Sequence, residues 1–257
     1  MLTEEQKHQF ETLGFLLIKE LIPMDEMKIY IDAFDETMLS ANNGVPWEEA
    51  PIRQQVVPFY RHNTAVYHRL LDHPSINVVL EDLIGKEYVF AVSEGIHHFG
   101  GTSWHHDSIS PEDHTHLKVV FFMHSVQADT GCLSVLPGSQ FLTFRERMEK
   151  YGKSMLARGK NVPGAYPIEA DAGDAVIFNV KLYHAAFGDG IERKALYLNY
   201  MQKATTHEEE EYIIHHYERD RRDRLWYTPD IFVDAPPERT RMLSFLKERC
   251  YDPVQSV

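Results

Sequence analysis

The sequence predicts a mainly β protein, in which antiparallel sheets are packed face to face or rolled up and helices precede and follow the sheets. Short β-rich runs, divided by Gly, Pro and Asp turns, follow one another over about 86–202. Helical patterns fill about 1–85 and about 203–257. With 257 residues, 43% of them apolar, the chain can bury a substantial core, so a disordered or fibrous protein is excluded. We expect a single domain over 1–257, without linkers or internal repeats.

The first elements have clear start and stop signals. Thr3 and Gln6 have the spacing of a capping box, so a helix is expected over about 4–13 and ends at Gly14. The run FLLIKEL that follows is typical of a short strand. A second helix is expected to begin near Pro23, because the apolar residues after it are spaced to share one helical face.

The remaining elements follow in order along the chain. A turn-rich loop is expected over 41–51, an extended segment over 52–63, and two helices over 64–72 and 75–84, interrupted at Pro74. The β runs are YVFAVSEGIHHFG, HLKVVFFMHSVQ, CLSVLPG, AYPIEA, DAVIFN and KALYLNYMQ. A helix-and-loop excursion over 144–164 interrupts them, and the runs THEEEEYIIHHYERDRRDRLWY and PPERTRMLSFLKERC are helical.

Charge and cysteine content limit the partners and the compartment. The formal charge of −13 argues against a nucleic-acid or anionic-membrane partner, whose phosphates would be repelled, and leaves a small molecule as the expected partner. Two cysteines, Cys132 and Cys250, are too few for a disulfide framework. The first residues contain no apolar signal core and no run approaches a membrane span, so a cytoplasmic protein is expected. The sequence makes no prediction of oligomeric state.

The segment SWHHDS contains two adjacent histidines and an aspartate. Successive side chains of a strand point to opposite faces, so His105 and Asp107 are expected to share a face and His106 to point away. An imidazole and a carboxylate side by side can bind a metal ion or hold a proton relay. Seven of the fifteen histidines fall between residues 97 and 124, which is a compositional hint of metal chemistry.

His184, far along the chain, is the candidate for a third ligand from a facing strand, and Arg193 begins the strand after it. Two histidines and one carboxylate on one side of Fe(II) leave three positions open, as non-haem oxygen activation requires. Zinc accepts the same ligand types, so the three residues alone do not identify the metal. Each residue taken singly is more often structural, since short motifs of this kind are unspecific.

The surrounding motifs resemble a known family. The runs WHHDS, DTGCLSVLPGSQ and DAGDAVIF, followed by LYHAAFGDGIERKALYLNY, occur in this order within about 88–202. They are similar to the phytanoyl-CoA dioxygenase (PhyH-like) family of Fe(II)/2-oxoglutarate-dependent oxygenases. That family has W-H-x-D, N-G-x-L-x-x-x-P-G-S-H, a G-D before a strand, a distal histidine and a downstream arginine. The resemblance implies a double-stranded β-helix, a cupin-like jelly roll, with helices at its flanks.

The resemblance also implies a reaction and a ligand set. His105, Asp107 and His184 would bind Fe(II), and Arg193 would bind the distal carboxylate of 2-oxoglutarate through its paired donors. The implied enzyme is a dioxygenase that converts 2-oxoglutarate and O2 to succinate and CO2 while it oxidises a substrate C–H. Halogenating relatives have a small residue in place of the aspartate. Asp107 therefore favours hydroxylation, or a desaturation or ring-forming variant of it.

The chain departs from the family pattern at three positions. Gln140 stands where a histidine is usual, Ala186 where a hydroxyl is frequent, and Thr130 where the turn usually has asparagine. The family often adds a polar cosubstrate contact from an earlier strand, for which Gln55 or Arg53 is the candidate.

Substrate contacts are expected from lids over 45–62 and 139–166 and from the strands beside the motif. The candidates are His97 or its neighbour, Phe59, Arg61 and Trp104. Two alternatives stay open. One is a cupin-like metalloenzyme that uses the same three ligands without 2-oxoglutarate. The other is a non-catalytic β roll that binds a small molecule and has a structural histidine–aspartate pair.

Overall fold

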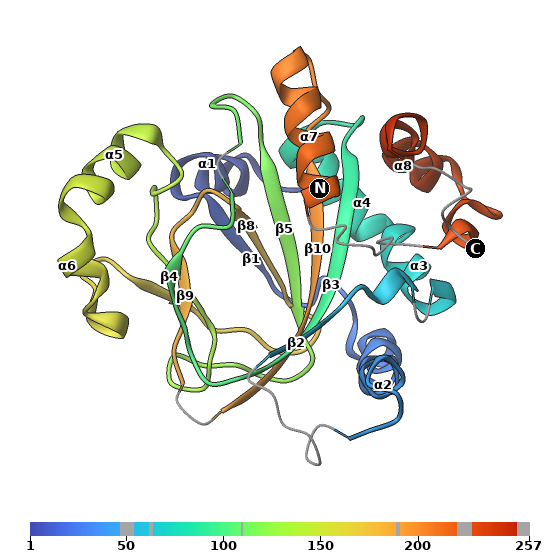
Figure 1. The fold of residues 1–257 in the computed structure, drawn as a ribbon, viewed down its shortest axis with the longest axis horizontal. Helices are drawn as coiled ribbons and strands as arrows, with labels where there is room; N and C mark the ends of the chain where they lie inside the picture. The colour runs from blue at the N-terminus through green and yellow to red at the C-terminus, as the bar shows by residue number, and fades with distance from the viewer. Residues whose placement is uncertain (47–53, 62–63, 109, 189–190, 220–227, 251–257) are drawn as a thin grey trace.

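Two antiparallel sheets form the core of the computed structural model, which describes all residues except 47–53, 62–63, 109, 189–190, 220–227 and 251–257 (Figure 1). The strands are β1 (Phe15–Ile18), β2 (Gln54–Val57), β3 (Val89–Phe99), β4 (Thr102–His105), β5 (His116–Phe122), β6 (Leu133–Val135), β7 (Tyr166–Ile168), β8 (Ala175–Asn179), β9 (His184–Ala186) and β10 (Glu192–Met201). The helices are α1 (Glu4–Leu13), α2 (Met24–Ala41), α3 (Thr64–Leu71), α4 (Pro74–Ile84), α5 (Leu142–Tyr151), α6 (Lys153–Leu156), α7 (His207–Arg219) and α8 (Pro237–Arg249). Short 3-10 helices lie at Phe59–Arg61, Gly159–Asn161 and Pro229–Phe232.

The larger sheet has six strands in the order β1-β8-β5-β10-β3-β2, and the smaller has four in the order β4-β9-β6-β7. All pairings between these strands are antiparallel. Apolar residues of both sheets, such as Phe15, Val120, Leu133 and Val135, pack into one buried cluster between them. This arrangement is the predicted double-stranded β-helix.

Alternation along β10 separates the core from the site. Leu196, Leu198 and Tyr200 lie in the buried cluster that includes the helices. Arg193 and Tyr197, which have the opposite parity, line a cavity between the sheets. One strand therefore stabilises the fold with one face and supplies site residues with the other.

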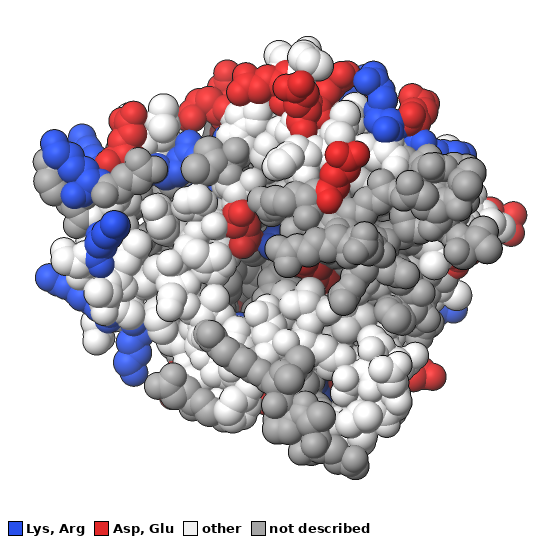
Figure 2. All heavy atoms as spheres, viewed as in Figure 1, with Lys and Arg blue, Asp and Glu red and all other residues white. Residues whose placement is uncertain are grey.

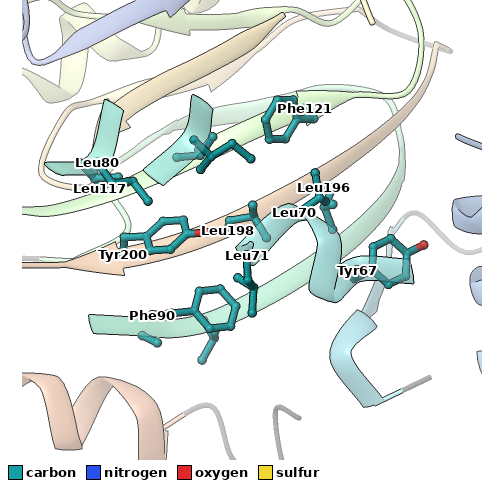
Figure 3. Packing of buried hydrophobic residues seen from close by; sticks show 14 of the residues in the cluster. Tyr67, Leu70, Leu71, Leu80, Phe90, Leu117, Phe121, Leu196, Leu198 and Tyr200 are labelled. Atoms are coloured by element: carbon teal, nitrogen blue, oxygen red, sulfur yellow. The ribbon is translucent and has the colours of Figure 1, made fainter. Parts of the chain in front are cut away.

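Helices cover the outer face of the larger sheet. Leu71 of α3 lies between Phe90 of β3 and Leu198 of β10 (Figure 3), and Tyr67 and Leu70 of the same helix belong to the same buried cluster. Each of these side chains is 2% exposed or less, and burial of each Leu and Phe side chain contributes about 1.5–3 kcal/mol of hydrophobic stabilisation. The same cluster takes in residues of α2, α4, α7 and α8. The helices thus hold the larger sheet rigidly behind the cavity.

A smaller cluster lies on the other side of the four-stranded sheet, under α5. It contains Trp104 of β4, Tyr183 next to β9, and Met148 of α5. This packing fixes the two strands that carry the candidate metal ligands.

Most of the element predictions are confirmed. The first helix covers Glu4–Leu13, and Thr3 and Gln6 form the reciprocal capping box. Gly14 ends that helix with a left-handed backbone, φ +81°, which glycine adopts at little cost. The segment 52–63 was expected to be extended throughout, and this is wrong in part. Within its described residues β2 ends at Val57, and a 3-10 helix follows Pro58, which has no backbone N–H to continue a ladder.

Candidate metal centre

The three predicted ligands converge at one edge of the smaller sheet. His105 is the last residue of β4, His184 is the first residue of β9, and the two are direct partners in the antiparallel pairing. Nε2 of each histidine lies 3.5 Å from Oδ1 of Asp107. The three candidate ligand atoms all lie within 4.8 Å of one another. Residues that are distant in sequence therefore present two nitrogens and one oxygen to a single point.

Backbone carbonyls orient both imidazoles. Nδ1 of His105 lies 2.8 Å from the carbonyl oxygen of Ser103, and Nδ1 of His184 lies 2.9 Å from that of Leu182. Because a carbonyl only accepts, each Nδ1 carries the proton and donates it. When the ring is neutral, Nε2 therefore carries the lone pair, which is the form of histidine that binds a metal ion.

His106 lies on the other side of the strand, as predicted. Its ring packs edge-on against Tyr183, with the ring centroids 5.3 Å apart. Asp107 itself was expected on the strand, but β4 ends at His105. The backbone N–H of Asp107 donates instead to the carbonyl of Val180, 3.1 Å away, and this bond keeps the carboxylate near the histidines.

The charge of Asp107 is balanced by a lysine. Lys118 of β5 places Nζ 2.8 Å from Oδ2 of Asp107. Burial raises the pKa of Asp107, but the charges of Lys118 and His184 outweigh this effect and hold that pKa well below its usual range. Burial lowers the pKa of His105, but the adjacent Asp107 carboxylate raises that pKa by more. An ionised carboxylate beside two imidazole lone pairs is the donor set that Fe(II) takes in facial sites, so these residues fit that metal.

Arg193 lies in the same cavity, which has a volume of about 220 Å³ and is lined by the three candidate ligands. Its Nη1 donates to the carbonyl of Gly131, 3.1 Å away. Its Nη2 lies 3.2 Å from Nδ1 of His98 and 3.4 Å from Oγ1 of Thr102. Since a guanidinium only donates, Nδ1 of His98 accepts. The arginine is 6% exposed and held from three directions.

The departures from the family pattern have structural counterparts. Ala186 lacks the hydroxyl that is frequent at its position in the family. Its direct strand partner, Thr102, carries a hydroxyl that lines the cavity beside it. Gln140 donates to the carbonyls of Glu11 and Thr12 and so ties the turn to the end of α1.

Two of the other candidates lie one residue away from a cavity residue. Gln55 donates to the carbonyl of Met38, 3.1 Å away, and it is Gln54 that lines the cavity. His97 contacts Glu192, whereas its neighbour on β3, His98, lines the cavity. The structure therefore places both Gln55 and His97 outside the cavity.

Other candidates lie in packed regions. Phe59 is fully buried, and its ring contacts Phe34 edge-on and Tyr67 at a tilt in the helical core. Trp104 donates from Nε1 to the carbonyl of Gly159 on the outer side of the smaller sheet. Neither residue lines the cavity. The side chain of Arg61 and all of Arg53 lie outside the described residues, as does much of the expected lid over 45–62.

Several cavity residues were missed by sequence reasoning. Glu94, Lys118 and Tyr197, from β3, β5 and β10, all line it. Glu94 and Tyr197 are direct strand partners. Because side chains alternate between the two faces of a strand, every second residue of β3, β5 and β10 was a possible cavity residue. The sequence did not indicate which of the two faces points into the cavity.

The fold and the site together define a double-stranded β-helix protein with a candidate His-Asp-His metal site. A model of the phytanoyl-CoA dioxygenase (PhyH) family matches residues 10–193, so the chain belongs to that family. It is accordingly a non-haem Fe(II)/2-oxoglutarate-dependent dioxygenase. No curated protein matches the chain by sequence.

Solved structures with the same fold include three that either contain 2-oxoglutarate or are described as alpha ketoglutarate dependent. HygX from Streptomyces hygroscopicus, with nickel and 2-oxoglutarate bound, is 18% identical with a TM-score of 0.62, over 80% of this chain and 89% of that one. The non-heme alpha ketoglutarate dependent epimerase SnoN from nogalamycin biosynthesis is 18% identical with a TM-score of 0.60, over 77% and 80%. EctD from S. alaskensis, with 2-oxoglutarate and 5-hydroxyectoine, is 16% identical with a TM-score of 0.59, over 78% and 76%. None of the helices in the described part of the chain combines the length with the apolar composition that a membrane span requires.

Proposed function

We propose that this dioxygenase oxidises an unactivated C–H bond of a small-molecule metabolite, with His105, Asp107 and His184 binding Fe(II) and Arg193 binding 2-oxoglutarate. Hydroxylation is the reaction proposed first, because Asp107 is present where halogenating relatives have a small residue.

One observation carries this proposal. The three candidate ligands and a buried, pre-oriented arginine line the same cavity of about 220 Å³. A carboxylate prefers the paired N–H donors of a guanidinium, and Arg193 is held by Gly131, His98 and Thr102 before any ligand arrives. Such pre-orientation lowers the entropic cost of binding the cosubstrate.

The protein residues have distinct tasks in this reaction. Bound Fe(II) and 2-oxoglutarate supply the oxidising chemistry, while the chain positions and shields them. The carbonyls of Ser103 and Leu182 keep both Nε2 atoms directed at the metal position. Thr102 and His98 hold Arg193 in place. Apolar residues such as Phe122 and Phe178 line the same cavity and limit the access of water to it.

Structures with the same fold support a small molecule as the substrate. EctD was crystallised with 5-hydroxyectoine, and SnoN acts in nogalamycin biosynthesis. The cavity of this chain has polar residues beside the metal ligands, namely Glu94, Lys118 and Tyr197. We infer that the reacting part of the substrate presents hydrogen-bonding groups to them.

The test is anaerobic titration of the apo-protein with Fe(II) and then with 2-oxoglutarate, followed by visible absorbance. A weak charge-transfer band that requires both additions is expected, because a 2-oxo acid chelates a facial-site iron through two open positions. Iron binding without such a band would favour the cupin-like enzyme that does not use 2-oxoglutarate. Failure to bind iron at all would refute the proposed metal site.

A further inference from the structure

Lys118 is a cavity residue whose charge is paired directly with a candidate metal ligand. It lies on β5, and its side chain is only 13% exposed. Its Nζ lies 2.8 Å from Oδ2 of Asp107 and 5.6 Å from the ring centroid of Tyr197. A lysine is rarely buried this far without a specific partner, and here the partner is a candidate metal ligand.

The two oxygens of Asp107 have different partners. Oδ1 faces the histidines, at 3.5 Å from each Nε2. Oδ2 is paired with Nζ of Lys118 at 2.8 Å, and the lysine balances its charge there. The carboxylate is therefore held with one oxygen toward the metal position and the other toward the lysine.

We propose that Lys118 is a positioning residue that makes Asp107 a one-oxygen ligand. A carboxylate can bind a metal through one or both oxygens, and binding through both would occupy a further coordination position. The cosubstrate needs two of the three positions that a facial site leaves open. By engaging Oδ2, Lys118 keeps those positions available for 2-oxoglutarate. This inference rests on the proposed function and deepens it.

The test compares wild type with Lys118→Met, which removes the charge and keeps much of the side-chain volume. Apo-proteins are titrated anaerobically with Fe(II) by calorimetry and then with 2-oxoglutarate by visible absorbance. We expect Lys118→Met to keep iron affinity within about threefold, because all three ligand side chains remain. It should weaken 2-oxoglutarate binding by about tenfold or more, because the second oxygen of Asp107 then competes for a position that the cosubstrate needs. At saturating cosubstrate its band should stay below about half of the wild-type intensity, because chelation by both oxygens of the 2-oxo acid is hindered.

Three further variants make the result specific. Lys118→Arg keeps a cation beside Asp107 and should restore both the affinity and the band. Lys194→Met is the matched control, since Lys194 is also a strand lysine, paired at 2.8 Å with Asp35 on the outer surface. It should behave as wild type. Should Lys118→Met fail to fold, Lys118→Gln is held to the same criterion, because it keeps a polar end without the charge.

The outcomes separate this inference from the function on which it rests. A normal wild-type band, with the same cosubstrate affinity and saturated band in Lys118→Met, overturns the role of Lys118 alone. A weaker affinity with an unchanged saturated band also overturns it, because the lysine would then only attract the cosubstrate's charge. Absence of iron binding or of the band in wild type overturns the proposed function and this inference with it.

Discussion

Replacing Arg193 with alanine is the most direct test of the cosubstrate pocket. The arginine is 6% exposed, and Gly131, His98 and Thr102 hold its guanidinium in place. A carboxylate bound by its fork would make two charge-assisted hydrogen bonds, each contributing about 1.5–3 kcal/mol. Their loss, about 3–6 kcal/mol, corresponds to a rise of about 10²- to 10⁴-fold in the Kd for 2-oxoglutarate.

The assay is a 2-oxoglutarate titration at a fixed, saturating concentration of Fe(II), with the visible band as the signal. Iron affinity serves as the internal control, because Arg193 is not among the three candidate ligands. Arg193→Lys keeps the charge but not the planar fork, and it should fall between wild type and Arg193→Ala. A Kd in Arg193→Ala within about threefold of wild type would refute the assignment of this residue.

Three further predictions address the fold and the metal ligands. His105→Ala should lose stoichiometric Fe(II) in an anaerobic metal assay while His106→Ala keeps it, since the two rings lie on opposite sides of the strand; equal loss in both would contradict this placement. An alanine at Gly95 would place its Cβ in steric overlap with one edge of the Phe59 ring, so Gly95→Ala should lower the free energy of unfolding in urea by about 1–3 kcal/mol. Burial lowers the pKa of His68 from 6.5 to about 4, so stability should be full above pH 6.5 and fall as the pH drops toward 4. Denaturation at several pH values should show a shallower fall in His68→Gln, and an identical profile would contradict the pKa shift.

The sequence predicted those elements whose residues carry a local signal. The capping box of Thr3 and Gln6 marks the first helix because its two hydrogen bonds link residues three apart. Pro74 separates α3 from α4 because it occupies the first turn of the second helix. His105, Asp107 and His184 were predicted together because motifs in a fixed order link them, although no local signal shows that β4 and β9 are paired.

The cavity residues were not predictable in the same way. Successive side chains of a strand point to opposite faces, and the sequence alone does not show which face lines the cavity. In the run QQVV of β2, each face of the strand would carry one glutamine and one valine. The sequence therefore does not indicate whether Gln54 or Gln55 faces the cavity. The adjacent histidines His97 and His98 present the same ambiguity on β3. Only the pairing of β2 and β10 with β3 decides that Gln54, His98 and Arg193 share one rung and one face.

The charges in the cavity predict that metal and cosubstrate bind cooperatively. Among the described cavity residues, Lys118 and Arg193 balance Asp107 and Glu94, so the formal charge there sums to zero. Fe(II) alone adds two positive charges and 2-oxoglutarate alone adds two negative ones. Either imbalance is unfavourable because the charged side chains of Lys118, Asp107 and Arg193 are mostly buried. We therefore expect 2-oxoglutarate to bind the apo-protein at least about tenfold more weakly than the Fe(II) form, and calorimetry should show the reciprocal gain in iron affinity. Equal affinity of 2-oxoglutarate for both forms would mean that Arg193 binds the cosubstrate independently of the metal, and the argument from charge balance would fail.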